Sequence, residues 1–217
     1  YVTEAEEQGI GRNVLGQPDP TISWKSLGYP SKPDEPVTAL SLRDMEAFSK
    51  WLSEEDGATY RLPLELEWFV AWRAGGDKKF GHTSNSDELG EFGWYDLQSD
   101  EGTSPRRLVA QKLPNPFGLY DMVGNVAERV VRVSSIAAFN RGLLELKSTP
   151  YRGGSYRHLV GLAENAVTTN DLYQDLGFRI MRELPEYPPT VRPVDAEGKP
   201  AGTSGASSAI DSRPIPR

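Results

Sequence analysis

Apolar residues recur at three- and four-residue steps in the stretch from Ser41 to Leu52, which is the spacing of an amphipathic helix. Ser41 and Asp44 have the spacing of a capping box, so we expect the helix to begin there. The side chains expected to face the core are Leu42, Met45, Phe48, Trp51 and Leu52.

A second helix is predicted from about Pro63 to Ala74, because proline is tolerated in a first turn and Gly75-Gly76 forms a stop signal. Its inward positions are expected to be Leu66, Phe69 and Val70. A short helix is also expected after Thr3, which has capping-box spacing with Glu6. The aromatic residues of the two longer helices are interpreted as core rather than as a ligand site.

Beyond Gly76 the pattern changes to short apolar pieces between glycines and prolines. Residues 77–116 are expected to be irregular, with one or two strands. Further strands are predicted at Tyr151 to Tyr156 and at Leu176 to Met181, and residues 130–133 alternate weakly. This pattern indicates a mixed, loop-rich domain.

The composition changes once more near Glu183, where a segment rich in Pro, Gly and Ser begins. Such a segment buries too little apolar surface to fold alone, so residues 183–217 are predicted to be a tail or linker. An extended proline-rich tail loses little freedom on binding, and it could dock on a neighbouring chain.

Charge and cysteine content exclude several functions. The 217 residues contain 24 Lys and Arg against 31 Asp and Glu, a net charge of −7 that argues against a nucleic-acid binder. No apolar run reaches the ~18 residues of a membrane span. The chain has no cysteine, so it can have no disulfide, zinc-thiolate site or cysteine nucleophile.

Four motifs in order resemble the formylglycine-generating enzyme (sulfatase-modifying factor) family. The first is P-V followed by S-L-x-D, A-F and W-L at residues 36–52, together with RLPLELEW at 61–68 and RAGG at 73–76. The others are PNPFGLYDMVGNV at 114–126, RGGSY at 152–156 and LGFR at 176–179. The resemblance identifies the chain as a cysteine-free member.

The resemblance implies an α+β, C-type-lectin-like fold of the formylglycine-generating kind, loop-rich, with two main helices and short antiparallel strands. Residues 1–182 would form this domain, and its first strands are expected upstream of Tyr1. We expect a bacterial protein in an extracytoplasmic or periplasmic location.

Active members of the family hold copper with two cysteines shortly after the Gly-Gly-Ser string. The resemblance places these positions at His158 and Ala163, so copper-dependent formylglycine formation is not expected and no catalytic residue is assigned. An iron site would need His158, His82 and an acid such as Asp175 together, and an ordinary loop role for both histidines is favoured.

A structural calcium site is the metal site that the resemblance implies. Hard cations take several oxygen ligands, and a turn at Gly124 could bring carboxylates and carbonyls together. The residues implied as ligands are Asp121, Gly124, Val126 and Glu128. The alternative is that Asp121 caps the turn while Glu128 pairs with Arg129 or Arg132.

The family usually has Trp-Glu-Trp where this chain has Ala127-Glu128-Arg129, and the loss of both indoles opens space for another partner. Arginine and aromatic residues around apolar ones are typical of protein interfaces. A face that binds a protein or a small molecule is predicted from Arg132, Tyr156, Arg157, His158, Leu159, Tyr173 and Asp175.

These observations favour a non-catalytic binding module, a pseudoenzyme on the family's scaffold. Two alternatives stay open. One is an oxidase that uses no thiolate, similar to the pyoverdine-maturation branch or to the lectin-like half of ergothioneine-type synthases. The other is the variable protein of a diversity-generating retroelement, although the chain continues for 38 residues past Arg179.

Overall fold

The structure is a computed structural model in which residues 1–13, 15–80, 83–95, 104–132, 150–157, 167–168 and 172–184 are described. The chain divides into two units, Tyr1–Glu183 and Leu184–Arg217. Since residues 185–217 lie outside the described part, the assignment of 183–217 as a tail stays a prediction. None of the helices in the described ranges has the length and apolar character needed to cross a membrane.

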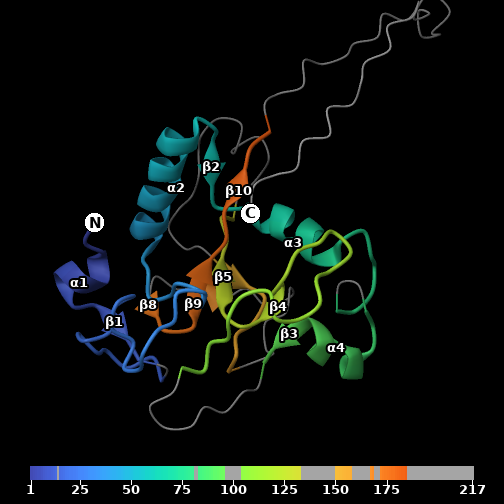
Figure 1. The fold of residues 1–217 in the computed structure, drawn as a ribbon, viewed down its shortest axis with the longest axis horizontal. Helices are drawn as coiled ribbons and strands as arrows, with labels where there is room; N and C mark the ends of the chain where they lie inside the picture. Colours follow the sequence, from blue (N-terminus) through green and yellow to red (C-terminus); the bar gives the residue numbers. More distant parts are fainter. Residues whose placement is uncertain are drawn as a thin grey trace, which may run out of the picture. The chain divides into compact units, whose positions relative to one another are not determined.

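The described residues form four helices and ten short strands (Figure 1). The helices are α1 (Glu4–Gln8), α2 (Leu42–Asp56), α3 (Glu65–Arg73) and α4 (Ser86–Phe92). The strands are β1 (Gly11–Arg12), β2 (Tyr60–Arg61), β3 (Gly93–Trp94), β4 (Val123–Gly124), β5 (Ala127–Arg129), β6 (Pro150–Arg152), β7 (Val167–Thr168), β8 (Leu172–Tyr173), β9 (Leu176–Phe178) and β10 (Met181–Arg182).

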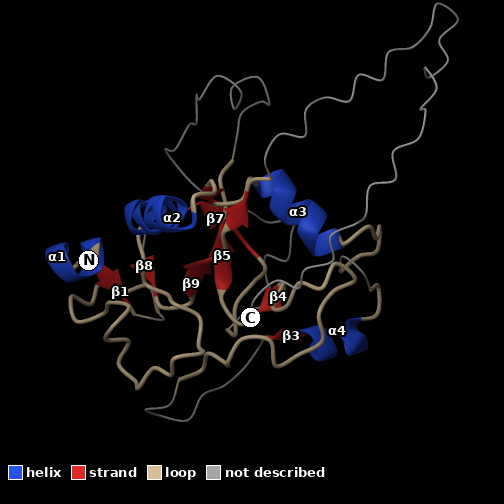
Figure 2. Ribbon diagram, turned by 45° about the horizontal axis from the view of Figure 1, so that its top comes forward, coloured by secondary structure: helices blue, strands red, loops and turns tan. Residues whose placement is uncertain are grey.

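A four-stranded sheet with the order β7-β6-β5-β9 forms the centre of the fold. Its strands β7, β5 and β9 are labelled among the red arrows of Figure 2. The pairs β7–β6 and β6–β5 are antiparallel, whereas β5–β9 is parallel. Two-stranded pairs flank it: β10–β2 is antiparallel, and β1–β8 and β3–β4 are parallel. The strands are as short as expected, and three of the six pairs are antiparallel as expected, while the other three are parallel.

The starts of α1 and α2 agree with the sequence prediction. Thr3 and Glu6 form a capping box at α1, and Ser41 and Asp44 form one at α2. The Asp44 carboxylate also accepts hydrogen bonds from the Glu4 backbone and the Tyr1 hydroxyl. One buried carboxylate therefore caps α2 and anchors the N-terminal segment.

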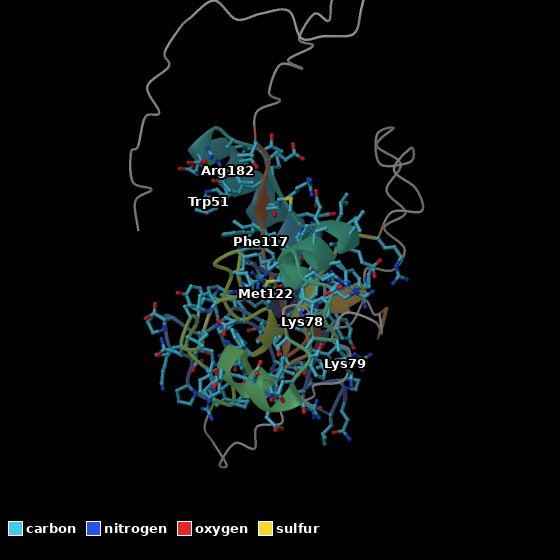
Figure 3. All side chains as sticks on the ribbon, turned by 90° about the vertical axis from the view of Figure 1, so that its right-hand side faces the viewer. Trp51, Lys78, Lys79, Phe117, Met122 and Arg182 are labelled. Carbon is cyan, nitrogen blue, oxygen red and sulfur yellow. The ribbon has the colours of Figure 1, made fainter. Side chains whose placement is uncertain are left out.

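The predicted inward face of α2 is only partly correct. Met45 is buried, but Phe48 and Trp51 are 42% and 52% exposed. The buried positions of α2 are Asp44, Met45 and Ser49. Asp44 faces inward as part of the capping box, and the Ser49 hydroxyl is satisfied inside by donating to the Met45 carbonyl. Trp51 lies with Arg182 of β10 toward one end of the domain (Figure 3).

The predicted inward face of α3 is correct only at Phe69, which packs against the main core cluster. Leu66 and Val70 are 64% and 56% exposed, whereas Trp68 and Trp72 are buried and their rings stack with centroids 6.3 Å apart. The indoles bury more apolar surface than Leu and Val, so they set the orientation of the helix. The main core cluster consists of Trp68, Trp72, Leu89, Met122, Val123 and Val130.

Gly124 shows why a glycine is required beside this core. Its φ is +74°, and a Cβ there would lie 1.9 Å from the Trp94 carbonyl oxygen. We expect Gly124→Ala to lower the free energy of unfolding by about 2 kcal/mol or more, measured by urea denaturation.

Gly118→Ala is the matched control, since Gly118 has φ +77° but nothing within 4 Å of its Cβ position. Gly118→Ala is expected to lower the free energy of unfolding by about 1–2 kcal/mol, which is the cost of placing a residue with a Cβ in a left-handed conformation. Equal losses in the two variants would contradict the close approach at Gly124.

Candidate ligand-binding pocket

The alternation of β5 sends its side chains to two sides of the central sheet. Ala127 lines a pocket of about 150 Å³ on one side. Glu128 points to the other side, where it meets the Trp68 indole of α3. The pocket is lined by Ala127, Tyr151, Gly154, Ser155, Arg157, Tyr173, Asp175 and Leu176.

Asp175 and Ser155 form the polar centre of this pocket. The Ser155 hydroxyl donates a hydrogen bond of 2.8 Å to Oδ2 of Asp175, and the backbone N–H of Arg157 donates to the Ser155 hydroxyl at 3.3 Å. The Asp175 carbonyl accepts from the Ala127 N–H at 2.8 Å, which fastens the β8–β9 turn to β5. The carboxylate is thus held in place by both main chain and side chain.

Two tyrosines and an arginine complete the wall. Tyr151 comes from β6, Tyr173 from β8 and Arg157 from the segment that follows the Gly-Gly-Ser string. Burial raises the pKa of Tyr151, and the negative charge of Asp175 raises it further. Tyr151 therefore stays a neutral phenol at physiological pH.

The predicted calcium residues lie around a buried ion pair. Both carboxylate oxygens of Glu128 accept hydrogen bonds of 2.5 Å from the Arg179 guanidinium, and one also accepts from the Trp68 indole at 2.7 Å. Asp121 has φ +53°; its Oδ2 accepts from the Ala110 N–H, and its Oδ1 is buried without a hydrogen bond. Burial raises the pKa of Asp121.

As placed, these residues do not form a calcium ligand set, since a hard cation needs several free oxygens and Glu128 has none. The described residues also contain no group of three or more His, Asp or Glu that could hold a metal. Calcium binding at Asp121, Gly124, Val126 and Glu128 would require Arg179 to move, and it stays a prediction. The alternative pairing of Glu128 with Arg129 or Arg132 is replaced by its pairing with Arg179.

Arg132 lies away from the pocket. It pairs with Glu65 of α3 at 2.8 Å, and Glu65 also pairs with Arg152, whose side chain is buried and lies over the Phe69 ring. The two guanidinium groups hold the pKa of Glu65 below its usual value, Arg132 having the larger effect. This cluster fastens α3 to the central sheet.

The structure brings together three of the seven residues predicted for the binding face: Arg157, Tyr173 and Asp175. Tyr156 is 2% exposed and does not line the pocket, because its side chain is part of the interior. His158 and Leu159 lie outside the described residues. The prediction missed Tyr151 and Ser155, although Ser155 belongs to the Gly-Gly-Ser string.

A second, larger cavity of about 410 Å³ lies between α2, α3 and the β9–β10 segment. Its walls are mainly apolar, and Phe48 and Phe178 meet there edge to face with ring centroids 5.8 Å apart. Two charged groups lie at its wall. Glu67 forms an ion pair with Arg61, and Arg179 forms one with Glu128.

Comparison with known proteins gives a consistent result. The family described as the sulfatase-modifying factor enzyme 1-like domain matches residues 10–184. A formylglycine-generating enzyme of Thermomonospora curvata is 32% identical over 127 residues, 50% of this chain and 39% of that protein. An inactive C-alpha-formylglycine-generating enzyme 2 of Bos taurus is 30% identical over 165 residues, 70% of this chain and 52% of that protein. The matches thus span about half or less of these relatives.

Solved structures show the same fold. The variable protein 1 of Treponema denticola has a TM-score of 0.57 at 22% identity, with 82% of this chain and 81% of that chain covered. PvdO from Pseudomonas aeruginosa has a TM-score of 0.58 at 25% identity, covering 72% and 65%. CarF has a TM-score of 0.54 at 25% identity, covering 72% of each chain.

Proposed function

The chain belongs to the sulfatase-modifying factor enzyme 1-like family, and from this membership and the pocket geometry we propose that it is a non-catalytic ligand-binding domain. The ligand site of this proposal is the pocket between β5, β6 and the β8–β9 turn. The ligand is a small molecule or a short part of a protein.

The absence of cysteine supports the loss of the family's oxidation chemistry. The resemblance puts His158 and Ala163 where active members have copper-binding cysteines. The chain has no cysteine at any other position that could replace them. A relative from Bos taurus bears the word inactive in its name, so loss of activity has a precedent among similar proteins.

The observation that carries the proposal is Ala127 in the pocket wall. The family usually has tryptophan there, and an indole on this strand position would occupy most of the about 150 Å³ that the pocket offers. The alanine is 5% exposed and its neighbours Asp175 and Leu176 hold the backbone in place. The open space therefore results from one small residue on a fixed strand.

The Ala127→Trp variant of the full chain tests the proposal. Ligand-observed NMR is run with a panel of small neutral, cationic, anionic and zwitterionic compounds. We expect at least one class to bind the parent protein and to lose binding in the variant, because the indole fills the pocket. Circular dichroism checks that the variant is folded.

Val70→Trp is the control, since Val70 is 56% exposed on α3 and does not line the pocket. It should bind like the parent. If Ala127→Trp does not fold, Tyr173→Ser removes a wall side chain and should change the ranking of the bound compounds. Binding that neither substitution alters would contradict the proposed site.

A thiolate-free oxidase is the second candidate, and the likeness to PvdO at 25% identity is what favours it. In that case the described chain would position a substrate, and residues elsewhere would hold the metal. The variable-protein alternative draws only on the fold that the chain shares with variable protein 1 of Treponema denticola. Metal content separates the oxidase from the binding domain, because only the oxidase needs a bound redox metal.

A further inference from the structure

We propose that the larger cavity between α2, α3 and the β9–β10 segment binds an uncharged small molecule with at least two aromatic rings. This inference goes beyond the proposed function, because the cavity is a second site that shares no lining residue with the pocket beside Ala127. It follows from the size of the cavity, from the rings in its wall and from the pairing of its charged groups.

The cavity is large enough for more than one ring. Its volume is about 410 Å³, and pockets for small-molecule ligands have roughly 300–1,000 Å³. An apolar cavity of about 150 Å³ already takes up a benzene molecule. The volume therefore admits a ligand of two fused or linked rings, whereas a single ring would leave part of the wall without contacts.

Aromatic side chains from three elements contribute to the wall. They are Phe48 of α2, Trp68 of α3 and Phe178 of β9. Phe48 and Phe178 meet edge to face with ring centroids 5.8 Å apart, and the Trp51 ring lies 5.6 Å from Phe48. Aromatic rings prefer edge-to-face and offset-stacked contacts with one another, so this wall favours an aromatic ligand over an aliphatic one of the same size.

Part of this aromatic wall is open to solvent. Phe48 is 42% exposed and Trp51 next to it is 52% exposed, whereas Trp68 is 1% exposed. Removing apolar surface from water is favourable in proportion to the area that is covered. A ligand ring beside Phe48 would cover such surface, and the exposure of Phe48 indicates that the cavity opens next to α2.

The charges of the wall are already paired, which favours an uncharged ligand. Eight of the ten lining residues are apolar, and the other two are Glu67 and Arg179. The Glu67 carboxylate accepts two hydrogen bonds from Arg61 and one from the Leu64 N–H. Arg179 donates to both carboxylate oxygens of Glu128. A charged ligand would leave water without finding an unpaired counter-charge among the ten lining residues, and such a transfer is unfavourable.

Fluorescence titration of the full chain with N-phenyl-1-naphthylamine tests the inference. The compound 8-anilinonaphthalene-1-sulfonate has the same rings with an added sulfonate, so it is the charged counterpart. We expect the uncharged probe to bind at least about tenfold more tightly, because no lining residue offers the sulfonate an unpaired cation. The aromatic compound 2-naphthol should displace the probe at concentrations at least about threefold lower than its saturated analogue, decahydro-2-naphthol.

Ala71→Trp should fill the cavity, since Ala71 of α3 lines its wall. The affinity for N-phenyl-1-naphthylamine should fall about tenfold or more, and circular dichroism checks that the variant is folded. Val70→Trp is the control and should bind like the parent, because Val70 is 56% exposed on the same helix and does not line the cavity. If Ala71→Trp does not fold, Phe48→Ser removes a partly exposed wall ring and should weaken binding at least about threefold.

The outcomes keep this inference separate from the proposed function. Probe binding that Ala71→Trp weakens and Ala127→Trp leaves unchanged supports a second site. The inference is overturned if the uncharged probe does not bind, if neither Ala71→Trp nor Phe48→Ser alters its binding, or if Ala127→Trp abolishes it. In each of these cases the proposed function depends on the pocket beside Ala127 alone. Equal affinity of the two probes, or equal displacement by the two naphthols, overturns the assigned chemical class.

Discussion

Replacing Arg106 by Met lowers the free energy of unfolding by about 3–5 kcal/mol, the largest stability loss that we expect from a polar substitution in this chain. Arg106 and Glu35 form an ion pair of 3.0 Å in which both side chains are 2% exposed. The guanidinium also donates to the Ser31 hydroxyl and the Pro36 carbonyl, and it lies over the Tyr29 ring. The variant leaves Glu35 charged and buried, with only weaker donors.

Urea denaturation followed by tryptophan fluorescence measures the loss, and a second substitution isolates its cause. Glu35→Gln added to Arg106→Met removes the unpaired charge, so the double variant should be more stable than Arg106→Met alone. Lys50→Met is the surface control, because Lys50 and Glu54 are 79% and 65% exposed, and it should cost less than about 1 kcal/mol. A loss below 1 kcal/mol in Arg106→Met would contradict the buried pair.

The second large effect is expected at Arg179, whose removal leaves Glu128 with the Trp68 indole as its remaining donor. The Glu128 side chain is 8% exposed, so Arg179→Met should lower the free energy of unfolding by about 3 kcal/mol. The same variant also tests calcium. If Arg179 stays paired with Glu128 in solution, added Ca²⁺ or a chelator changes the melting temperature of the parent protein by less than about 1 °C.

In Arg179→Met the oxygens of Glu128 are released beside Asp121, and added Ca²⁺ should raise the melting temperature by several degrees. Arg182→Met is the control, since Arg182 is 55% exposed and its nearest acid, Asp56, is 3.6 Å away. If Ca²⁺ stabilises the parent protein by several degrees, Arg179 does not hold Glu128 in solution. The four residues expected from the resemblance then act as ligands.

Local signals in the sequence predicted the helix starts well. The capping boxes at Thr3 and Ser41 involve residues three positions apart, so the sequence contains all that is needed to place them. The helix α4 was missed although Asn85 caps it through the Asp87 N–H. Glycines around it favoured an irregular segment, and its single buried residue, Leu89, gives no periodic pattern.

Helix faces and pocket walls depend on long-range contacts, which explains where prediction failed. The orientation of α3 follows from the Trp68 indole reaching Glu128, 60 positions away. The pocket joins Ala127, Tyr151 and Asp175 only because β5 pairs with both β6 and β9. Arg157, Tyr173 and Asp175 were found because they lie near the Gly-Gly-Ser and Gly-Phe-Arg strings.

Metal content measured together with oxygen consumption distinguishes a binding domain from an oxidase. The purified full chain is incubated with copper or iron and then desalted. Bound metal is measured by mass spectrometry and oxygen uptake by an electrode, with a cysteine-containing peptide as substrate. For a binding domain we expect substoichiometric metal and no oxygen uptake above the buffer rate. Stoichiometric copper or iron with peptide-dependent oxygen uptake would contradict it.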